Sequence, residues 1–313
     1  MAVSERMIDS RVSFTVEVAS RALTLACQQV GINSSGAELI RLGSNGVFRI
    51  GDDGIARVSP PTARSSTRSA IVENAKKQIA VSRWLMSVGY SVTRAMDVAQ
   101  PVEAEDCAVT FWESVGPETL FAPIEQVAAL IRRLHDLDWP PATVDLPELL
   151  PFGGTGQPVP DFDGLATSDA VFMRERYLWA REQFGRLEYP LGRGPIHGDA
   201  NVGNVLVDSH GEAVLIDLDS FSIGPREWDL IQTALFADRL GWHTAEEYRI
   251  FVEVYGYDIT QWEGYATLAD MREIAMTAWL SNQARTSPSA AAEAAKRIEA
   301  IRSGGSRRDW GAY

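Results

Sequence analysis

The residues best suited to chemistry in this sequence lie in the segment 195–219. Asp199, Asn204, Asp217 and Asp219 offer carboxylate and amide oxygens within it. Mg²⁺ prefers a few hard oxygen ligands and keeps the rest of its coordination shell for water and substrate phosphates. A further carboxylate beside such an ion could orient or deprotonate a hydroxyl that attacks a terminal phosphate. The residue types therefore indicate a Mg-nucleotide bound beside an acceptor hydroxyl, with Asp199 in the role of the base.

A β-hairpin is expected to bring these groups together. Residues 204–207 and 212–217 are typical of two short strands, with turn-forming residues between them. Folding this ribbon about His210 would place Asn204 opposite Asp217, where cross-strand neighbours lie about 5 Å apart. Asp219 should face the same way as Asp217, because side chains alternate along a strand. It is equally compatible with a second metal ligand and with a solvated carboxylate.

The pattern His197-Gly-Asp, four residues, Asn204, followed by Ile-Asp-Leu-Asp219, resembles the catalytic segment of the aminoglycoside phosphotransferase and choline kinase group. These are small-molecule kinases with a protein-kinase-like fold. The resemblance implies that Asp199 is the catalytic aspartate and that Asn204 and Asp217 bind Mg²⁺ beside ATP or GTP. It also implies that His197 supports the loop and does no chemistry itself.

A second segment, Gly-Pro-Arg-Glu-Trp-Asp-Leu at 224–230, extends this resemblance. It implies that Asp229 lies at the start of a helix and steadies the catalytic loop. The fold implied is α+β and bilobal. A small antiparallel β-sheet lobe would occupy residues 1–112, with a helical extension at 14–30 and a sheet and helix at 39–112. A larger, mainly helical lobe would occupy residues 113–313 and carry the catalytic and acceptor-binding groups.

The small lobe is expected to contain strands at 39–42, 46–50 and 54–59, followed by a helix at 69–87. The loop between the first two strands contains Ser44 and Asn45 between glycines. In a kinase-like lobe such a loop lies over the nucleotide phosphates, because small residues let the backbone approach an anion closely. The same four residues are also compatible with an ordinary hairpin turn.

Arg57 is a departure from the kinase pattern. The third strand of a kinase-like lobe normally carries a Lys that contacts the phosphates, and this sequence has Arg57 there. A guanidinium can bind phosphate, but as a planar fork and not as a point charge. Its partner on the following helix would be Gln78, where the family usually has a glutamate, or else Glu73.

The end of the lobe offers a hinge. Residues 109–115 are typical of a strand that runs into a Gly-Pro connector, and the backbone there could bind the adenine edge. Glu113 and Ser114 are the candidate hinge residues. An edge strand that ends at a turn would have the same sequence.

The large lobe is expected to be helical, with a long Pro- and Gly-rich loop at 139–164. Helices are indicated at 122–137, 168–187, 227–240, 245–255, 268–284 and 289–301. Asp238, Trp242 and Trp279 are candidates for the acceptor site, because aromatic rings and carboxylates both attract ammonium groups. Each is also compatible with an ordinary packing or surface role.

Composition and charge restrict the function. The chain has 313 residues and a net charge of −13. Residues 1–116 are balanced, whereas residues 117–313 carry 17 basic and 30 acidic side chains. This excess disfavours nucleic acid as a partner and favours a cationic acceptor, although it also fits simple solubility. The chain has two cysteines, no signal-like start and no long apolar run. These features predict a cytoplasmic protein that does not bind membranes. We expect a monomer or homodimer.

The expected function is that of an ATP- or GTP-dependent phosphotransferase that modifies a hydroxyl of a small, amine-bearing molecule. The resemblance favours an aminoglycoside or another antibiotic, and hence a role in antibiotic resistance. A choline, aminosugar or amino-alcohol kinase stays open as an alternative. Because Arg57 and Gln78 replace a Lys and Glu pair, a nucleotide-binding pseudokinase with a regulatory role stays open as well.

Overall fold

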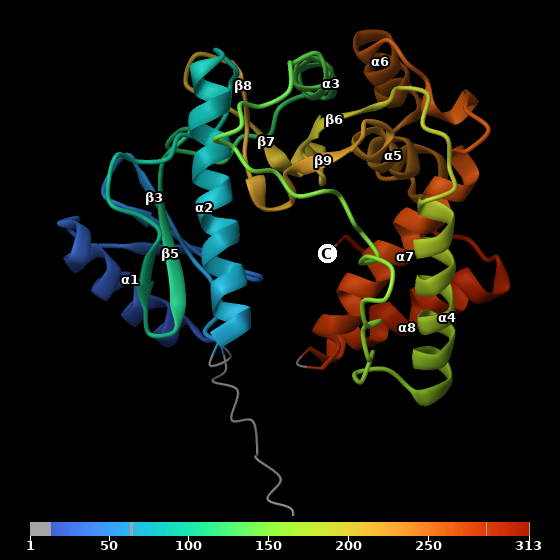
Figure 1. Cartoon of the computed structure of the whole chain (residues 1–313), viewed down its shortest axis with the longest axis horizontal. Coiled ribbons are helices and arrows are strands. Elements are labelled where there is room, and N and C mark those ends of the chain that lie inside the picture. Colours follow the sequence, from blue (N-terminus) through green and yellow to red (C-terminus); the bar gives the residue numbers. More distant parts are fainter. Residues whose placement is uncertain (1–13, 63–64, 286, 313) are drawn as a thin grey trace, which may run out of the picture. The chain divides into compact units, whose positions relative to one another are not determined.

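The structure is a computed structural model that describes residues 14–62, 65–285 and 287–312 (Figure 1). The chain divides into two compact units. One contains an antiparallel sheet and the other is mainly helical, so the α+β class predicted from sequence is confirmed. Unit 1 comprises the chain up to Phe121, together with Pro141–Asp145 and Val205–Asp219. Unit 2 comprises Ala122–Pro140, Leu146–Asn204 and the chain from Ser220 onward. The chain therefore passes between the units several times, in contrast to the single boundary expected near residue 113.

Unit 1 is built on a five-stranded antiparallel sheet. Its strands, in spatial order, are β1 (Glu38–Leu42), β2 (Gly46–Ile50), β3 (Gly54–Val58), β5 (Cys107–Glu113) and β4 (Val102–Ala104). The three N-terminal strands and β5 were predicted from their β-branched and aromatic residues. The three-residue strand β4 was missed, because so short a run has no periodicity to detect.

The two faces of this sheet serve different purposes. On one face Ala56, Val58, Phe48 and Phe111 are buried in a core that includes residues of helix α1 (Val16–Val30). Arg57 lies between two of these buried positions, so its side chain emerges on the opposite face. Helix α2 (Ser65–Ser87) covers that face, and the sheet lies between the two helices (Figure 1). The sheet thus presents Arg57 to α2.

The predicted hairpin is present in unit 1, with shorter strands than expected. Strands β7 (Val205–Val207) and β8 (Ala213–Leu215) pair antiparallel, with Val205 opposite Leu215. The prediction that the second strand runs through Asp217 is wrong. Asp217 has a left-handed backbone, φ 61°, and Asp219 lies in the short 3₁₀ helix η2 (Leu218–Ser220). The chain bends sharply at these two carboxylates instead of continuing the pleat.

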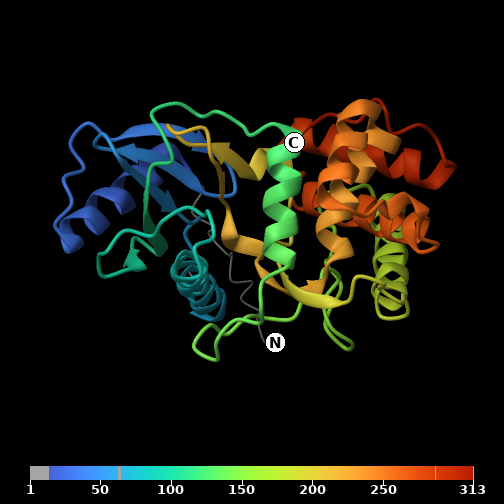
Figure 2. The ribbon, with the colours of Figure 1, turned by 90° about the horizontal axis from the view of Figure 1, so that it is seen from above.

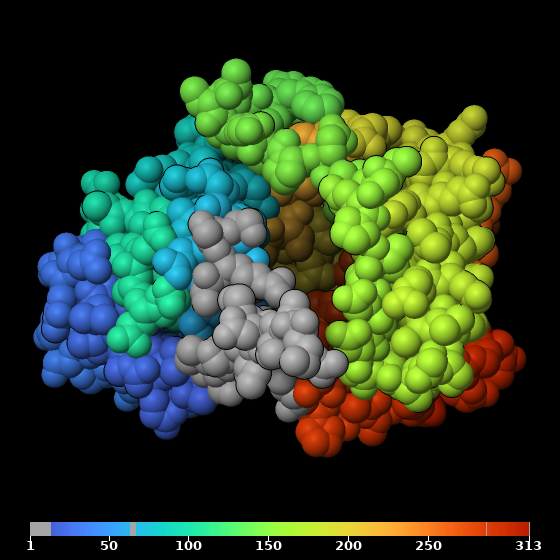
Figure 3. All heavy atoms as spheres, turned by 60° about the horizontal axis from the view of Figure 1, so that its bottom comes forward, coloured from blue at the N-terminus to red at the C-terminus, as the bar shows by residue number. Residues whose placement is uncertain are grey.

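Unit 2 is mainly helical. Its longer helices are α3 (Ile124–His135), α4 (Thr167–Phe184), α5 (Glu227–Leu235), α6 (Ala245–Tyr255), α7 (Tyr265–Gln283) and α8 (Pro288–Ser303). Helix α5 continues into the π-helical turn η3 (Phe236–Leu240). Helices α3 and α6 pack side by side (Figure 2), and α7 packs against α4, α5 and α8. On the face drawn in Figure 3, α4 and α8 contribute to one surface.

A two-stranded ribbon that the sequence did not predict positions the His-Gly-Asp segment of unit 2. Strands β6 (Arg193–Ile196) and β9 (Ser222–Pro225) pair antiparallel. The His-Gly-Asp segment leaves the end of β6 and is followed by the 3₁₀ turn η1 (Val202–Asn204), while β9 leads directly into α5. The ribbon therefore brings the His-Gly-Asp segment beside the first turn of α5. None of the helices in the described ranges is both long and apolar enough to cross a membrane.

Candidate active site

The His-Gly-Asp loop of unit 2 requires its glycine. Gly198 has φ 84°, in the left-handed region, and a Cβ built there would lie 2.4 Å from the carbonyl oxygen of Ser220. A side chain at this position would clash with backbone, which cannot yield easily. The loop conformation that presents Asp199 therefore depends on glycine at position 198.

Asp229, in the first turn of α5, holds this loop from beneath. Its two carboxylate oxygens accept hydrogen bonds from the backbone N–H groups of His197 and Gly198, each at 2.8 Å. His135 Nε2 lies 3.1 Å from the same carboxylate. Burial acts to raise the pKa of Asp229, but the hydrogen bond and charge of His135, together with His197, lower it. Asp229 is thus a buried, satisfied carboxylate.

Asp199 is held on both of its carboxylate oxygens. Arg272 Nη2, from α7, lies 2.6 Å from Asp199 Oδ1. Asn204 Nδ2 donates to Asp199 Oδ2 at 3.0 Å and to its carbonyl oxygen at 2.8 Å. The Asp199 side chain is nevertheless 43% exposed, so an incoming hydroxyl could reach it. This arrangement suits a carboxylate that orients an acceptor and takes its proton.

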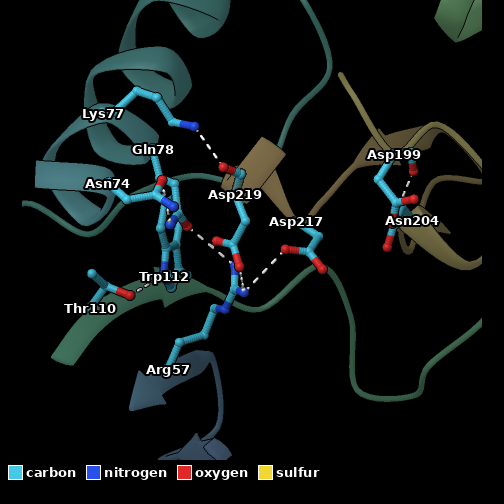
Figure 4. Close-up of polar contacts among 10 residues, drawn as sticks. All are labelled: Arg57, Asn74, Lys77, Gln78, Thr110, Trp112, Asp199, Asn204, Asp217 and Asp219. Carbon is cyan, nitrogen blue, oxygen red and sulfur yellow. Dashed lines mark hydrogen bonds and ion pairs between the residues drawn. The ribbon is translucent and has the colours of Figure 1, made fainter. Parts of the chain in front are cut away.

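In unit 1, Arg57 gathers three of the predicted residues (Figure 4). Its Nη2 lies 3.1 Å from Asp217 Oδ1 and 2.9 Å from Asp219 Oδ2, and its Nη1 donates to Gln78 Oε1 at 3.3 Å. Glu73, the alternative partner, is exposed and pairs with Lys76 instead. Burial opposes the charge of Arg57, but the two aspartates outweigh it and its pKa is raised. Arg57 therefore stays cationic beside two carboxylates.

Asp219 has one oxygen left over. Its Oδ1 is buried and has no hydrogen-bond partner among the described residues, while its Oδ2 faces Arg57. Burial raises the pKa of this carboxyl, and the charge of Arg57 offsets the effect only in part. An orphaned, buried carboxylate oxygen next to a second carboxylate fits the hard-oxygen donor set that Mg²⁺ prefers. The residues present are therefore compatible with a metal ion.

A cavity of about 140 Å³ adjoins this group in unit 1. Its wall includes Arg57, Gln78 and Asp219, with Asn45 from the loop between β1 and β2 and Thr110 from β5. Trp112, two residues further along β5, donates its indole N–H to the Thr110 hydroxyl at 2.9 Å (Figure 4). Asn45 is thus brought to Arg57, whereas Ser44 is an exposed residue of the same loop.

The candidate hinge residues have their N–H groups engaged. Glu113 N donates to Arg94 O at 2.8 Å, and Ser114 N donates to Asp53 O at 2.7 Å. The Ser114 hydroxyl also accepts a hydrogen bond from Arg49. Contacts from these two residues to an adenine edge would therefore come from their carbonyl oxygens or side chains.

The three acceptor candidates have different surroundings in unit 2. Asp238 accepts a hydrogen bond from the Tyr265 hydroxyl at 2.8 Å, and Trp279 is 45% exposed. Tyr265, Arg272 and Trp279 are spaced by seven residues along α7, which places them on one face at intervals of about 10 Å. Trp242 instead packs on Phe236 and donates to Trp310 O. Trp279 and Tyr265, the partner of Asp238, therefore lie one on each side of Arg272 along α7, whereas Trp242 makes packing contacts.

Two charged residues of these clusters were not predicted from sequence. Arg272 contacts Asp199, and Lys77 Nζ donates to the backbone oxygen of Asp219 at 2.6 Å (Figure 4). Burial lowers the pKa of Lys77 to about 8, although the charge of Asp219 acts in the opposite direction. Arg272 is 73 residues away from Asp199 and belongs to no local motif, so only the fold reveals it. The sequence signal that could have indicated Lys77 was its position next to Gln78.

Comparison with known proteins agrees with this geometry. The pattern of the phosphotransferase enzyme family matches residues 39–270. No curated protein matches the chain significantly.

Several solved structures share the fold at low sequence identity. An amicoumacin kinase, hAmiN, in complex with AMP-PNP, Ca²⁺ and Ami, has a TM-score of 0.66 at 15% identity, covering 92% of this chain and 94% of that one. A spectinomycin phosphotransferase, APH(9)-Ia, with ADP and its antibiotic has a TM-score of 0.59 at 14% identity, covering 89% and 93%. The choline kinase LicA from Streptococcus pneumoniae has a TM-score of 0.56 at 12% identity, covering 89% and 99%.

The family match and the fold together decide the classification. The matched residues span most of the chain and include the His-Gly-Asp loop, the two carboxylates after β8 and the first turn of α5. The resemblance noted from the catalytic motifs is thereby confirmed. The chain belongs to the phosphotransferase enzyme family.

Proposed function

We propose that this protein transfers the γ-phosphate of ATP to a hydroxyl group of a small molecule. The observation that carries the proposal is the accessible carboxylate of Asp199 on a loop fixed by Asp229, Gly198 and Asn204. A carboxylate held in this way can accept the hydroxyl proton and direct the oxygen toward phosphorus. His197 contributes through its backbone, which ties the loop to Asp229.

The nucleotide contacts are assigned to unit 1. Arg57 binds phosphate oxygens through its guanidinium, Gln78 orients it, and Ser44 and Asn45 place their backbone near the phosphates. Support comes from the cavity that Asn45, Arg57 and Gln78 line together. The carbonyl oxygens of Glu113 and Ser114 meet the adenine edge. ATP is the proposed phosphate donor, and GTP is the alternative donor.

Asn204, Asp217 and Asp219 are proposed to hold Mg²⁺. When bound, the ion neutralises part of the phosphate charge. Asp217 and Asp219 supply carboxylate oxygens, of which the buried Oδ1 of Asp219 has no partner in the described part of the chain. Before nucleotide binds, the positive charge of Arg57 offsets the negative charge of both aspartates.

The acceptor is proposed to lie along the face of α7 that Arg272 shares with Trp279. Trp279 offers an exposed aromatic surface about 10 Å from Arg272, and Asp238 offers a carboxylate at the opposite end through its bond to Tyr265. An aromatic ring and a carboxylate on one face suit an amine-bearing antibiotic larger than choline. The amicoumacin and spectinomycin complexes among the similar structures agree with that class.

The test is phosphotransfer measured by mass spectrometry, with Mg-ATP and Mg-GTP against aminoglycosides, other antibiotics, aminosugars, choline and amino alcohols. Asp199→Asn should reduce product formation by about 10²- to 10⁴-fold, because the carboxylate can no longer accept the proton. The nucleotide-induced rise in melting temperature should persist in this variant. Nucleotide binding without transfer to any acceptor or to water would favour a regulatory pseudokinase, and absence of nucleotide binding would refute the assignment of Arg57.

A further inference from the structure

Arg272 is a buried arginine in direct contact with the catalytic carboxylate. Its side chain is only 10% exposed, and its Nη2 lies 2.6 Å from Asp199 Oδ1. The same nitrogen is hydrogen-bonded to Gln232 Oε1 of α5. An arginine buried at this depth requires polar partners, since an unpaired buried charge is costly. Asp199 and Gln232 are those partners.

Trp228 couples this arginine to the catalytic loop. The Arg272 guanidinium carbon lies 5.1 Å from the centre of the Trp228 ring, within the range of a cation–π contact. The indole N–H of Trp228 donates to Gly198 O at 2.9 Å. A single tryptophan therefore contacts both the arginine and the glycine that precedes Asp199. The position of the guanidinium is fixed relative to the loop.

The two oxygens of Asp199 are consequently restrained from two sides. Arg272 binds Oδ1 and Asn204 binds Oδ2, so the carboxylate cannot rotate without breaking one of these bonds. Its exposed side stays open to an acceptor. A base that is displaced by about 1 Å from its productive position can lose about 10²-fold in rate.

We propose that Arg272 is the positioning residue for the catalytic aspartate. It fixes Oδ1 of the carboxylate that receives the acceptor proton. It does so from α7, a helix that lies outside the catalytic motifs. This inference rests on the proposed phosphotransferase function. It adds to that function a requirement for one guanidinium on α7.

Arg239 provides a matched control. It is also a largely buried arginine, and its Nη1 pairs with Asp270 at 2.7 Å and with Glu273 at 2.8 Å, both on α7. Neither of those carboxylates belongs to the catalytic loop. Arg272→Met, on α7, and Arg239→Met, on the turn η3 that pairs with α7, thus remove the same chemical group, and only the first releases Asp199.

The experiment compares these variants with wild type, using Mg-ATP and whichever acceptor of the panel is phosphorylated, or water if hydrolysis alone is seen. Arg272→Met should lower kcat by about 100-fold, while the nucleotide-induced rise in melting temperature is unchanged. Arg272→Lys should recover part of kcat, because an ammonium can still contact Asp199 but cannot reach Gln232 as a fork. Millimolar guanidinium should restore activity to Arg272→Ala in a saturable way.

The possible failures are distinguishable. If Arg272→Met keeps kcat within about threefold of wild type, or if it loses no more than Arg239→Met and guanidinium does not restore Arg272→Ala, Arg272 has a purely structural role and the inference is wrong. If wild type shows no Asp199-dependent transfer to any acceptor or to water, the proposed function itself fails, and the role of Arg272 fails with it.

Discussion

The His-Gly-Asp loop of unit 2 and the Arg57 cluster of unit 1 are organised in opposite ways. Around Asp199, the carboxylate oxygens are paired: Asp229 accepts two backbone N–H groups, and Arg272 and Asn204 each hold one oxygen of Asp199. Around Arg57, one guanidinium serves two aspartates and a glutamine, and a buried oxygen of Asp219 has no partner in the described structure.

Under the proposed function, this difference separates a base whose oxygens are already held from a cluster that still has to receive its ligands. A base must be in place before its acceptor arrives, so its hydrogen bonds are already made. Groups that bind a metal ion and phosphates must exchange partners when the nucleotide enters. We therefore expect some of their hydrogen-bonding atoms to be without a partner beforehand. We therefore expect substitutions near Asp229 to affect folding, and substitutions near Arg57 to affect nucleotide binding.

The largest effect is expected from Asp229→Ala. It would leave the N–H groups of His197 and Gly198 buried without an acceptor and should lower the free energy of unfolding by about 3 kcal/mol or more, measured by urea denaturation. Asp208→Ala is the control, because Asp208 Oδ1 also accepts two backbone N–H groups, but near the surface of the hairpin turn. It should cost no more than about 1 kcal/mol. Equal losses in both variants would contradict the contrast.

Gly198→Ala should have the next largest effect. A left-handed backbone costs an L-residue about 1–2 kcal/mol, and the new Cβ would also meet Ser220 O. Gly211 has nearly the same φ, 83°, and nothing within 4 Å of its Cβ position. Gly211→Ala should therefore show the backbone cost alone, whereas Gly198→Ala should unfold more easily and lose phosphotransfer. Full activity in Gly198→Ala would show that the loop is less constrained than this geometry implies.

Lys77 gives the stability of the Arg57 cluster a dependence on pH. Its pKa is lowered by burial from the ordinary 10.5 to about 8, so between these values the unfolded chain binds the proton that the folded chain has lost. The contribution of this group to stability therefore rises with pH across that window, by up to about 3 kcal/mol. Lys77→Met should remove that rise from the pH profile of thermal unfolding. Lys76→Met, which alters the exposed pair with Glu73, should keep it.

Gln78→Glu should produce the smallest change. The new carboxylate would face Arg57, which already serves two aspartates, and would add negative charge beside bound phosphates. Binding of Mg-ATP, measured by calorimetry, should weaken by about 1 kcal/mol, or several-fold. Glu73→Gln should leave affinity unchanged, because Glu73 pairs with Lys76. Tighter binding in Gln78→Glu would contradict this expectation and indicate that Arg57 needs a third anion.

The same contrast describes what could be predicted from the sequence. The β7–β8 hairpin, the helix at Asp229 and the strands of the sheet follow local rules of turns and periodicity, and the structure contains them. The sharp bend at Asp217 was missed, because nothing local marks a positive φ at an aspartate. The contact between Arg272 and Asp199 was missed because it joins helix α7 to a distant loop, and such pairings arise only from tertiary packing.

The repeated passage of the chain between its two units has a consequence for biosynthesis. Unit 1 includes β7, β8 and the two carboxylates that bind Arg57, yet these residues are separated in the chain from Phe121 by part of unit 2. A ribosome must therefore translate residues 205–219 before unit 1 can finish folding, even though its sheet emerges early. Until then Arg57 has Gln78 available but lacks both aspartates, so its charge is not yet balanced by a carboxylate from 205–219.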